Sequence, residues 1–259
     1  METFFAVPQG EFMLPMRLTE PDFGTPARCI LGVHGFCGHK ASDVLASVSE
    51  EMSLFGSAMV CFDLPCHGES PMTERDLSVE SCRQTILTAA RWAKEHYPEL
   101  PMCLLATGMG AFLTVLCLDE LRGILGDVRM VLQSPDFRMA QSLLSIKHLT
   151  EEQFRRMGRV VCGRPADRKM EISYSFYEQL KNAVAYADFD MPMLLIHGEC
   201  DEAVPLEDVV RFRRINDRAE LVIVPGADHQ FRGEGQWDMV VDLTRDWFEF
   251  EQVTLCDCE

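Results

Sequence analysis

The stretch that decides the fold is Leu104-Leu105-Ala106-Thr107-Gly108-Met109-Gly110-Ala111. It follows an apolar run at 102–105 and leads into a second apolar run at 112–118. A short, continuous apolar run is typical of a strand that is buried on both faces. The glycines between the two runs permit a sharp corner. We therefore predict that a buried strand turns directly into a helix at Gly108.

Corners of this kind occur in two functional motifs. In the nucleophile elbow, G-x-S-x-G, a strained central serine exposes its Oγ above the sheet. This chain has Gly108 at the serine position and Ala106 in place of the first glycine. A dinucleotide-binding turn, G-x-G-x-x-G, needs a third glycine where this chain has Leu113. The corner alone does not decide between an elbow that has lost its serine and an ordinary strand-to-helix turn.

Apolar runs alternate with helical patterns on both sides of this corner. A hairpin is predicted to open the chain, followed by alternating buried strands and amphipathic helices. Alternation of this kind predicts an α/β protein whose mainly parallel sheet carries helices on both faces. The hairpin strands are predicted at 4–7 and 12–18, the buried strands at 29–33, 58–62, 102–105, 129–132, 193–196 and 221–224, and the main helices at 42–54, 78–97, 205–215 and 237–250.

The alternation stops between residues 137 and 190. A segment of that length without a buried strand is usually a functional insertion. We predict helices at 139–146, 151–157 and 175–187 and a hairpin around 163–168, which together form a cap inserted into a core made of 1–136 and 191–259. Its aromatic residues are candidates for substrate contact, although residues at helical spacing also pack a helix onto a core. These candidates are Phe137, Phe154, Tyr174 and Phe176.

Composition excludes several classes of partner. The net charge of −17 argues against binding to nucleic acid or to an anionic membrane, because both need clustered Lys and Arg. Small neutral or cationic ligands remain open. The first residues lack the pattern of a signal peptide and no stretch is long enough to span a membrane, so we expect a cytoplasmic protein. We expect its eleven cysteines to be thiols, and the sequence predicts neither a metal site nor a cofactor.

Polar residues follow most of the predicted strands. In an open α/β sheet, ligands bind beyond the carboxyl ends of the strands, so these residues are the candidates for chemistry. They lie in the sequences His34-Gly35-Phe36, Asp63-Leu64-Pro65-Cys66-His67-Gly68-Glu69-Ser70, His197-Gly198-Glu199-Cys200-Asp201 and Gly226-Ala227-Asp228-His229.

Together with the corner, these motifs occur in the order elbow, acid, histidine, which resembles the α/β-hydrolases. The resemblance spans nearly the whole chain and includes Val204-Pro205 after the acid. It is closest to the small capped serine hydrolases, which include monoglyceride lipases, cinnamoyl or feruloyl esterases and serine aminopeptidase-like proteins. The resemblance implies an esterase-like or lipase-like hydrolase.

The resemblance also implies a role for each site residue. His229 resembles the general base, and Asp201 resembles the acid that orients it. Phe36 and Met109 resemble the residues whose backbone N–H groups form the oxyanion hole. Gly108 stands at the nucleophile position and has no side-chain atom that could attack a carbonyl. The triad therefore lacks its nucleophile.

Several competing assignments remain at these loops. Asp228 competes for the acid role, but its adjacency to His229 makes a good contact with Nδ1 awkward. His34, His67 and His197 are interpreted as residues that brace loops. The thiols of Cys37, Cys66 and Cys200 are poor candidates for a substitute nucleophile, because thiolate activation needs close contact with the base.

Three hypotheses follow from the glycine at the elbow. The chain is an ester hydrolase without its serine, with weak activity or none. Alternatively it is a natural pseudoenzyme that binds an acyl or aromatic ester-like molecule, or an enzyme that uses the Asp201 and His229 pair for another reaction. The presence of both Asp201 and His229 favours the first hypothesis, because an abandoned site has no need of them.

Overall fold

The computed structural model describes residues 1–163 and 169–249. The tip of the hairpin that is predicted around 163–168 lies outside the described residues, as does the chain beyond residue 249.

An eight-stranded sheet forms the centre of the molecule, in the order β1-β2-β4-β3-β5-β6-β9-β10. The hairpin β1–β2 is antiparallel, and β2 also pairs antiparallel with β4. All other neighbouring strands run parallel, so the predicted α/β class is confirmed. The strands are β1 (Glu2–Gln9), β2 (Phe12–Thr19), β3 (Arg28–Val33), β4 (Ser57–Phe62), β5 (Met102–Thr107), β6 (Val128–Gln133), β9 (Met193–Gly198) and β10 (Ala219–Val224).

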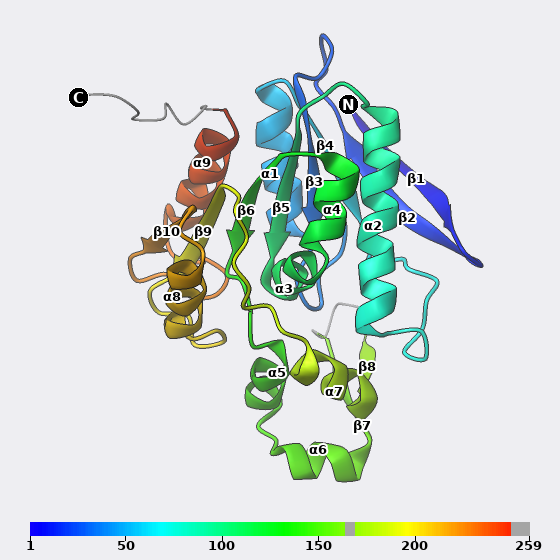
Figure 1. The fold of residues 1–259 in the computed structure, drawn as a ribbon, viewed down its shortest axis with the longest axis vertical. Helices are drawn as coiled ribbons and strands as arrows, with labels where there is room; N and C mark the ends of the chain where they lie inside the picture. The colour runs from blue at the N-terminus through cyan, green and yellow to red at the C-terminus, as the bar shows by residue number, and fades with distance from the viewer. Residues whose placement is uncertain (164–168, 250–259) are drawn as a thin grey trace.

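Helices cover both faces of this sheet (Figure 1). Alternate residues of the central strands contribute to two separate apolar clusters, one on each face. One cluster packs against α1 (Asp43–Leu54) and α9 (Gln236–Glu249). The other packs against α2 (Val79–His96), α3 (Gly108–Leu116), α4 (Leu118–Leu125) and α8 (Leu206–Ile215). Among the described helices, none combines the length and the apolar composition that a membrane crossing requires.

The segment between β6 and β9 leaves the sheet and forms a layer of its own. Figure 1 shows it at the lower end of the molecule, below the carboxyl ends of the parallel strands. It contains α5 (Met139–Lys147), α6 (Glu151–Met157), the antiparallel pair β7 (Arg159–Cys162) and β8 (Met170–Ser173), and α7 (Tyr174–Asn182).

Helix α7 is shorter than the sequence predicts, because it ends at Asn182 instead of continuing to residue 187. The following chain is held in an irregular conformation by the side chain of Asn216. This amide accepts a hydrogen bond from the Phe189 N–H (2.8 Å) and donates one to the Ala187 carbonyl (3.1 Å). A hydrogen bond from a distant residue thus overrides the local helical pattern.

The corner between β5 and α3 depends on its two glycines for different reasons. Gly108 has φ +49°, the left-handed conformation that glycine adopts without a Cβ penalty. Gly110 has an ordinary φ, but a Cβ there would overlap the His34 carbonyl oxygen and lie 2.8 Å from that of Val33. The first turn of α3 therefore packs directly against the end of β3, which only a glycine permits.

This packing predicts opposite effects of alanine at two helical glycines. Gly110→Ala places a methyl group against backbone and should destabilise the fold by at least about 2 kcal/mol. Gly123→Ala is the matched control, because Gly123 lies within α4 and no heavy atom of the described neighbours is within 4 Å of its Cβ position. It should stabilise by roughly 0.5–1 kcal/mol through helix propensity. Urea unfolding followed by circular dichroism measures both, and equal midpoints would contradict the proposed contact.

Candidate active site

The structure brings Asp201 and His229 into direct contact. His229 Nδ1 lies 2.7 Å from Asp201 Oδ2, and the Asp201 side chain is completely buried. The other oxygen, Oδ1, accepts hydrogen bonds from the N–H groups of Ala203 (2.9 Å) and Val204 (2.8 Å). A carboxylate held in this way accepts a hydrogen bond from Nδ1–H of His229, which leaves Nε2 of the neutral ring as a proton acceptor.

The loops that carry these two residues meet because β9 and β10 are parallel neighbours. Gly198 ends β9, and a Cβ there would overlap the Ala227 carbonyl oxygen and lie 2.7 Å from that of Asp228. The Cys200 N–H donates a hydrogen bond to the same Ala227 oxygen (2.8 Å). The loop after β10, which carries His229 (the histidine loop), thus lies across the start of the loop after β9, which carries Asp201 (the acid loop). Glycine at position 198 makes this approach possible.

The carboxylate of Asp228 makes its hydrogen bonds within its own loop and not with His229. Its carboxylate accepts hydrogen bonds from Arg232 Nε (2.6 Å) and from the Gln230 N–H (3.0 Å), both in its own loop. The hydrogen-bond partner of His229 Nδ1 is therefore Asp201, although the charge of Asp228 still acts on the ring.

Burial and charge act in opposite directions on the pair. Burial lowers the pKa of His229, but its hydrogen bond to Asp201 and the charges of Asp201, Asp136 and Asp228 together raise it above its ordinary value. Burial raises the pKa of Asp201, but the hydrogen bonds and charge of its partners bring it below its ordinary value. The pair therefore favours an ionised Asp201 and stabilises the imidazolium form of His229.

A second carboxyl group, Asp136, belongs to this site. The loop after β6 is hydrogen-bonded to the corner, to the histidine loop and to α5. The Asp136 N–H donates a hydrogen bond to the Gly108 carbonyl (3.2 Å). Ser134 Oγ donates one to the His229 carbonyl (3.2 Å). Asp136 Oδ1 accepts a hydrogen bond from Ser142 Oγ on α5 (2.9 Å). Sequence analysis missed this residue, although it too follows the carboxyl end of a buried strand.

The Asp136 carboxyl is also electrostatically coupled to His229. Burial raises its pKa to about 6, although the hydrogen bonds from Ser142 and the Arg138 N–H and the charge of His229 favour the ionised form. Its charge in turn raises the pKa of His229. Two buried carboxyl groups, from the loops after β6 and β9, therefore act on the imidazole of His229 in addition to Asp228.

The predicted oxyanion-hole residues lie on the two segments that pack at the corner. Met109 is the second residue of α3, and Phe36 follows the Gly35 backbone that lies beside the corner. A Cβ built on Gly35 would lie 3.1 Å from Thr107 Oγ1. The use of the Phe36 and Met109 N–H groups as oxyanion donors stays a prediction.

The other histidines of these loops make structural hydrogen bonds. His34 is fully buried, which lowers its pKa to about 4; its Nδ1 donates to the Gly35 carbonyl (2.8 Å) and its Nε2 accepts from the Leu64 N–H (3.0 Å). His67 Nδ1 bonds to the Pro65 carbonyl (2.8 Å), and His197 Nε2 to that of Val204 (3.1 Å). Among residues 1–163 and 169–249, no cluster of three or more His, Cys, Asp or Glu side chains is placed to hold a metal.

The aromatic candidates of the inserted segment are mostly buried within the protein. Phe154 and Phe176 are 0% and 1% exposed, and Phe137 stacks on Phe212 of α8 with ring centroids 3.9 Å apart. Tyr174 is partly buried and its hydroxyl donates to Glu151 (3.1 Å). Packing accounts for these positions, and substrate contact by the four residues stays a prediction.

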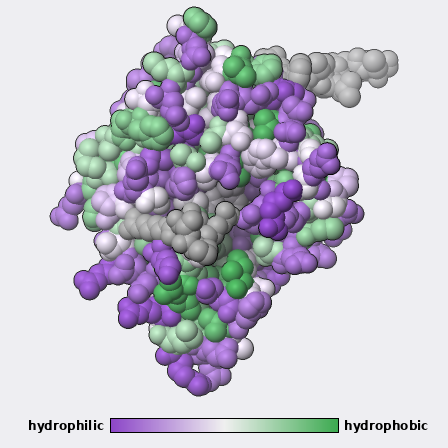
Figure 2. All heavy atoms as spheres, turned by 180° about the vertical axis from the view of Figure 1, so that it is seen from behind, coloured by the Kyte–Doolittle hydropathy of each residue, from purple (hydrophilic) through white to green (hydrophobic). Residues whose placement is uncertain are grey.

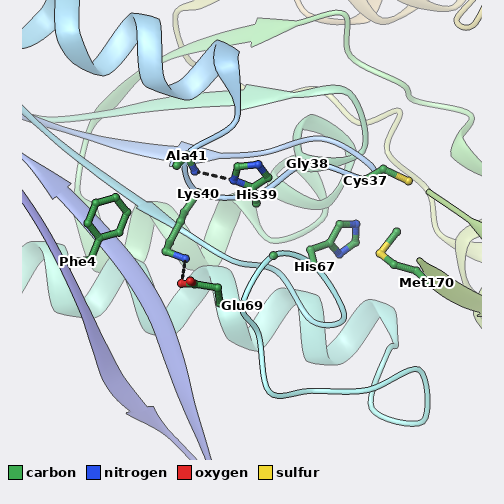
Figure 3. Close-up of a pocket in the computed structure, with 10 residues that line it drawn as sticks. Phe4, Cys37, Gly38, His39, Lys40, Ala41, His67, Glu69 and Met170 are labelled. Carbon is green, nitrogen blue, oxygen red and sulfur yellow. Dashed lines mark hydrogen bonds and ion pairs between the residues drawn. The ribbon is translucent and has the colours of Figure 1, made fainter. Parts of the chain in front are cut away.

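Two cavities border the inserted segment. The first has a volume of about 370 Å³ and lies between β8 and the loops after β3 and β4. Figure 3 shows Cys37, His67 and Met170 around one part of it. In another part, Lys40 is directed at Glu69. Lys40 Nζ bonds to Asp63 (2.8 Å) and Glu69 (2.5 Å). The second, of about 530 Å³, is lined by Met157 and Val161 among others and holds no residue of the predicted site. Figure 2 shows apolar side chains gathered on the lower part of the molecule, where the inserted segment lies.

The parallel sheet, the glycine corner after β5 and the acid and histidine after β9 and β10 define an α/β-hydrolase fold. The family model described as serine aminopeptidase, S33, matches residues 24–188, more than half of the chain. The chain belongs to this family of α/β-hydrolases.

Solved structures agree with this fold over nearly the full length. Est1E of Butyrivibrio proteoclasticus with bound ferulic acid is 19% identical with a TM-score of 0.74, and 94% of this chain and 97% of that chain are covered. The mouse alpha/beta hydrolase domain-containing protein 10 is 16% identical with a TM-score of 0.74, and coverage is 95% and 98%. Dienelactone hydrolase of Anabaena variabilis is 18% identical with a TM-score of 0.62, and coverage is 96% of both chains. No curated protein sequence matches the chain.

The three carboxylates around His229 should affect its pKa unequally. A negative charge favours the imidazolium, so replacing each carboxylate by its amide should lower the pKa of His229. The effect should be largest for Asp201→Asn, smaller for Asp136→Asn and smallest for Asp228→Asn. Titration of the His229 ring signals by NMR measures the order. An unchanged pKa in Asp136→Asn would show that Asp136 is not coupled to the base.

Proposed function

We propose that this site is that of a carboxylic-ester hydrolase built on the Ser-His-Asp plan, in which Gly108 stands at the nucleophile position. The observation that carries the proposal is the hydrogen bond between Asp201 and His229, whose acid is fully buried and held by two further N–H donors. Such an arrangement fixes the tautomer and orientation of a general base. A loop histidine without a catalytic role does not need it.

The glycine removes the acyl-enzyme route. Without Oγ at position 108 no covalent ester can form there, so this chain has no activity by that route and is inactive or very weakly active as a hydrolase. The surrounding packing leaves room for a serine, because the nearest described heavy atom beyond the chain neighbours and helix backbone of Gly108 is Gly35 Cα, 3.8 Å from the Cβ position. The φ of +49° is the kind of strained conformation that a nucleophile elbow imposes on its serine.

The proposed substrate is a small ester with an acyl or aromatic group. Residues 137–190 are proposed to act as a cap, since β8 of this segment contributes Met170 to the cavity beside Cys37, the residue after the predicted oxyanion donor Phe36. The ferulic acid bound to Est1E supports an aromatic acid component. The net charge of −17 favours neutral or cationic esters over anionic ones.

Binding without catalysis is the second candidate, and glycine itself favours it. A glycine at φ +49° carries none of the strain that a serine has there, so the substitution is expected to stabilise the fold by about 1 kcal/mol. A protein that binds its ligand without catalysis gains stability from glycine in place of serine and loses no activity that it needs.

Restoring the hydroxyl tests the proposal. Gly108→Ser should raise kcat/KM on p-nitrophenyl acetate and butyrate by about three or more orders of magnitude over the unmodified chain, because serine, His229 and Asp201 act as a unit. The restored enzyme should react with a fluorophosphonate probe, and adding His229→Ala should abolish both properties.

Gly108→Ala is the matched control, because it carries the same backbone strain and no nucleophile; it should show no gain in activity. Circular dichroism shows whether each variant is folded. A folded Gly108→Ser variant that neither hydrolyses these esters nor reacts with the probe would refute the hydrolase proposal and leave the non-catalytic one.

A further inference from the structure

The space above Gly108 differs from that at the other glycines of the site. Cβ atoms on Gly110 and Gly198 would overlap backbone atoms, but apart from the chain neighbours and helix backbone of Gly108 itself, only Gly35 Cα among the described residues lies within 4 Å of a Cβ there, at 3.8 Å. The His229 ring is therefore more than 4 Å from that position. A water oxygen forms its hydrogen bonds at roughly 2.7–3.0 Å, so the described packing leaves room for one above Gly108.

The imidazole of His229 is available to accept a proton. Nδ1 of His229 is committed to Asp201, so Nε2 carries the lone pair of the neutral ring. The His229 side chain is 35% exposed, which leaves the ring accessible to solvent and to a small substrate.

The loop after β6 holds the base and the corner in a fixed relation. Ser134 donates a hydrogen bond to the His229 carbonyl and the Asp136 N–H donates one to the Gly108 carbonyl, so one short segment is bonded to the backbone of both residues. General-base catalysis needs such fixed geometry, because a proton is transferred only over hydrogen-bond distance.

We propose that, in the chain as it stands, His229 activates a water above Gly108 for direct attack on the carbonyl carbon of an ester. The proposal rests on the proposed function, because it uses the same base, acid and oxyanion donors. It goes beyond that function by giving the glycine form a reaction route without a covalent intermediate.

One reaction cycle consumes one water molecule and cleaves one ester bond. The water oxygen bonds to the carbonyl carbon while His229 Nε2 takes one of its protons, and the carbonyl oxygen becomes an oxyanion beside the Phe36 and Met109 N–H groups. Collapse of this intermediate breaks the bond to the alcohol oxygen, which receives the proton from His229. A carboxylic acid and an alcohol result, and the acid then loses its proton to solvent.

The rate should be low but measurable. Loss of a triad member leaves about 10³–10⁴-fold acceleration over water from the oxyanion hole and binding in serine proteases. General-base catalysis typically contributes 10²–10⁴-fold of a rate. Activated esters with phenolic leaving groups are therefore the substrate class that this route serves, since their uncatalysed hydrolysis is already fast enough to be brought into a measurable range.

The test compares the unmodified chain with His229→Ala on p-nitrophenyl acetate. We expect His229→Ala to lose about 100-fold in the protein-dependent rate. His96→Ala is the matched control: this exposed histidine stacks on Trp92 of α2, away from the site, and its replacement should leave the rate unchanged. The unmodified chain should show no burst of p-nitrophenol, no acyl adduct by intact-protein mass spectrometry and no fluorophosphonate labelling.

Gly108→Ser separates the two proposals. If it is active while the unmodified chain is no faster than His229→Ala, the water route is wrong and the hydrolase proposal stands. If the unmodified chain turns over with an acyl adduct on a cysteine, the water route is also wrong. If Gly108→Ser is folded and inert, the hydrolase proposal fails, and the water route falls with it.

Discussion

The close approach of the first turn of α3 to the end of β3 is the constraint on which the rest of the site depends. Gly110 has no room for a Cβ because the carbonyl groups of Val33 and His34 lie against it. This contact places the loop that begins at His34 beside the corner, and with it the backbone of Phe36. The predicted oxyanion donors, Phe36 and Met109, lie on these two segments, and the absence of a side chain at Gly110 lets the segments touch.

A second glycine permits a close approach of two backbone segments at the other end of the site. Gly198 lets the histidine loop cross the acid loop at the Ala227 carbonyl, and the contact between Asp201 and His229 follows from that crossing. Asp136 then connects this pair to the corner and to α5 of the inserted segment. Helix α5 of the inserted segment is therefore hydrogen-bonded to a buried carboxyl group whose charge acts on His229.

Gly108 is of a different kind from Gly110 and Gly198. Nothing in the described packing requires a glycine there, since its Cβ position is open. What glycine contributes is relief of the backbone strain at φ +49°. The hydrogen bonds of Asp201 to His229, Ala203 and Val204 are all present although residue 108 carries no side chain.

The sequence by itself determined the class of the fold and the residues that follow each strand. Buried strands of a parallel sheet are local apolar runs, so β3 to β6, β9 and β10 are visible in the chain, and the loops after β9 and β10 presented Asp201 and His229 as candidates. Only the tertiary structure decided which groups meet. The order of the strands, the end of α7 at Asn182, the buried carboxyl of Asp136 and the open space at Gly108 each depend on residues far apart in the chain. Local periodicity carries no information about such contacts, because burial and charge act through space and not along the sequence.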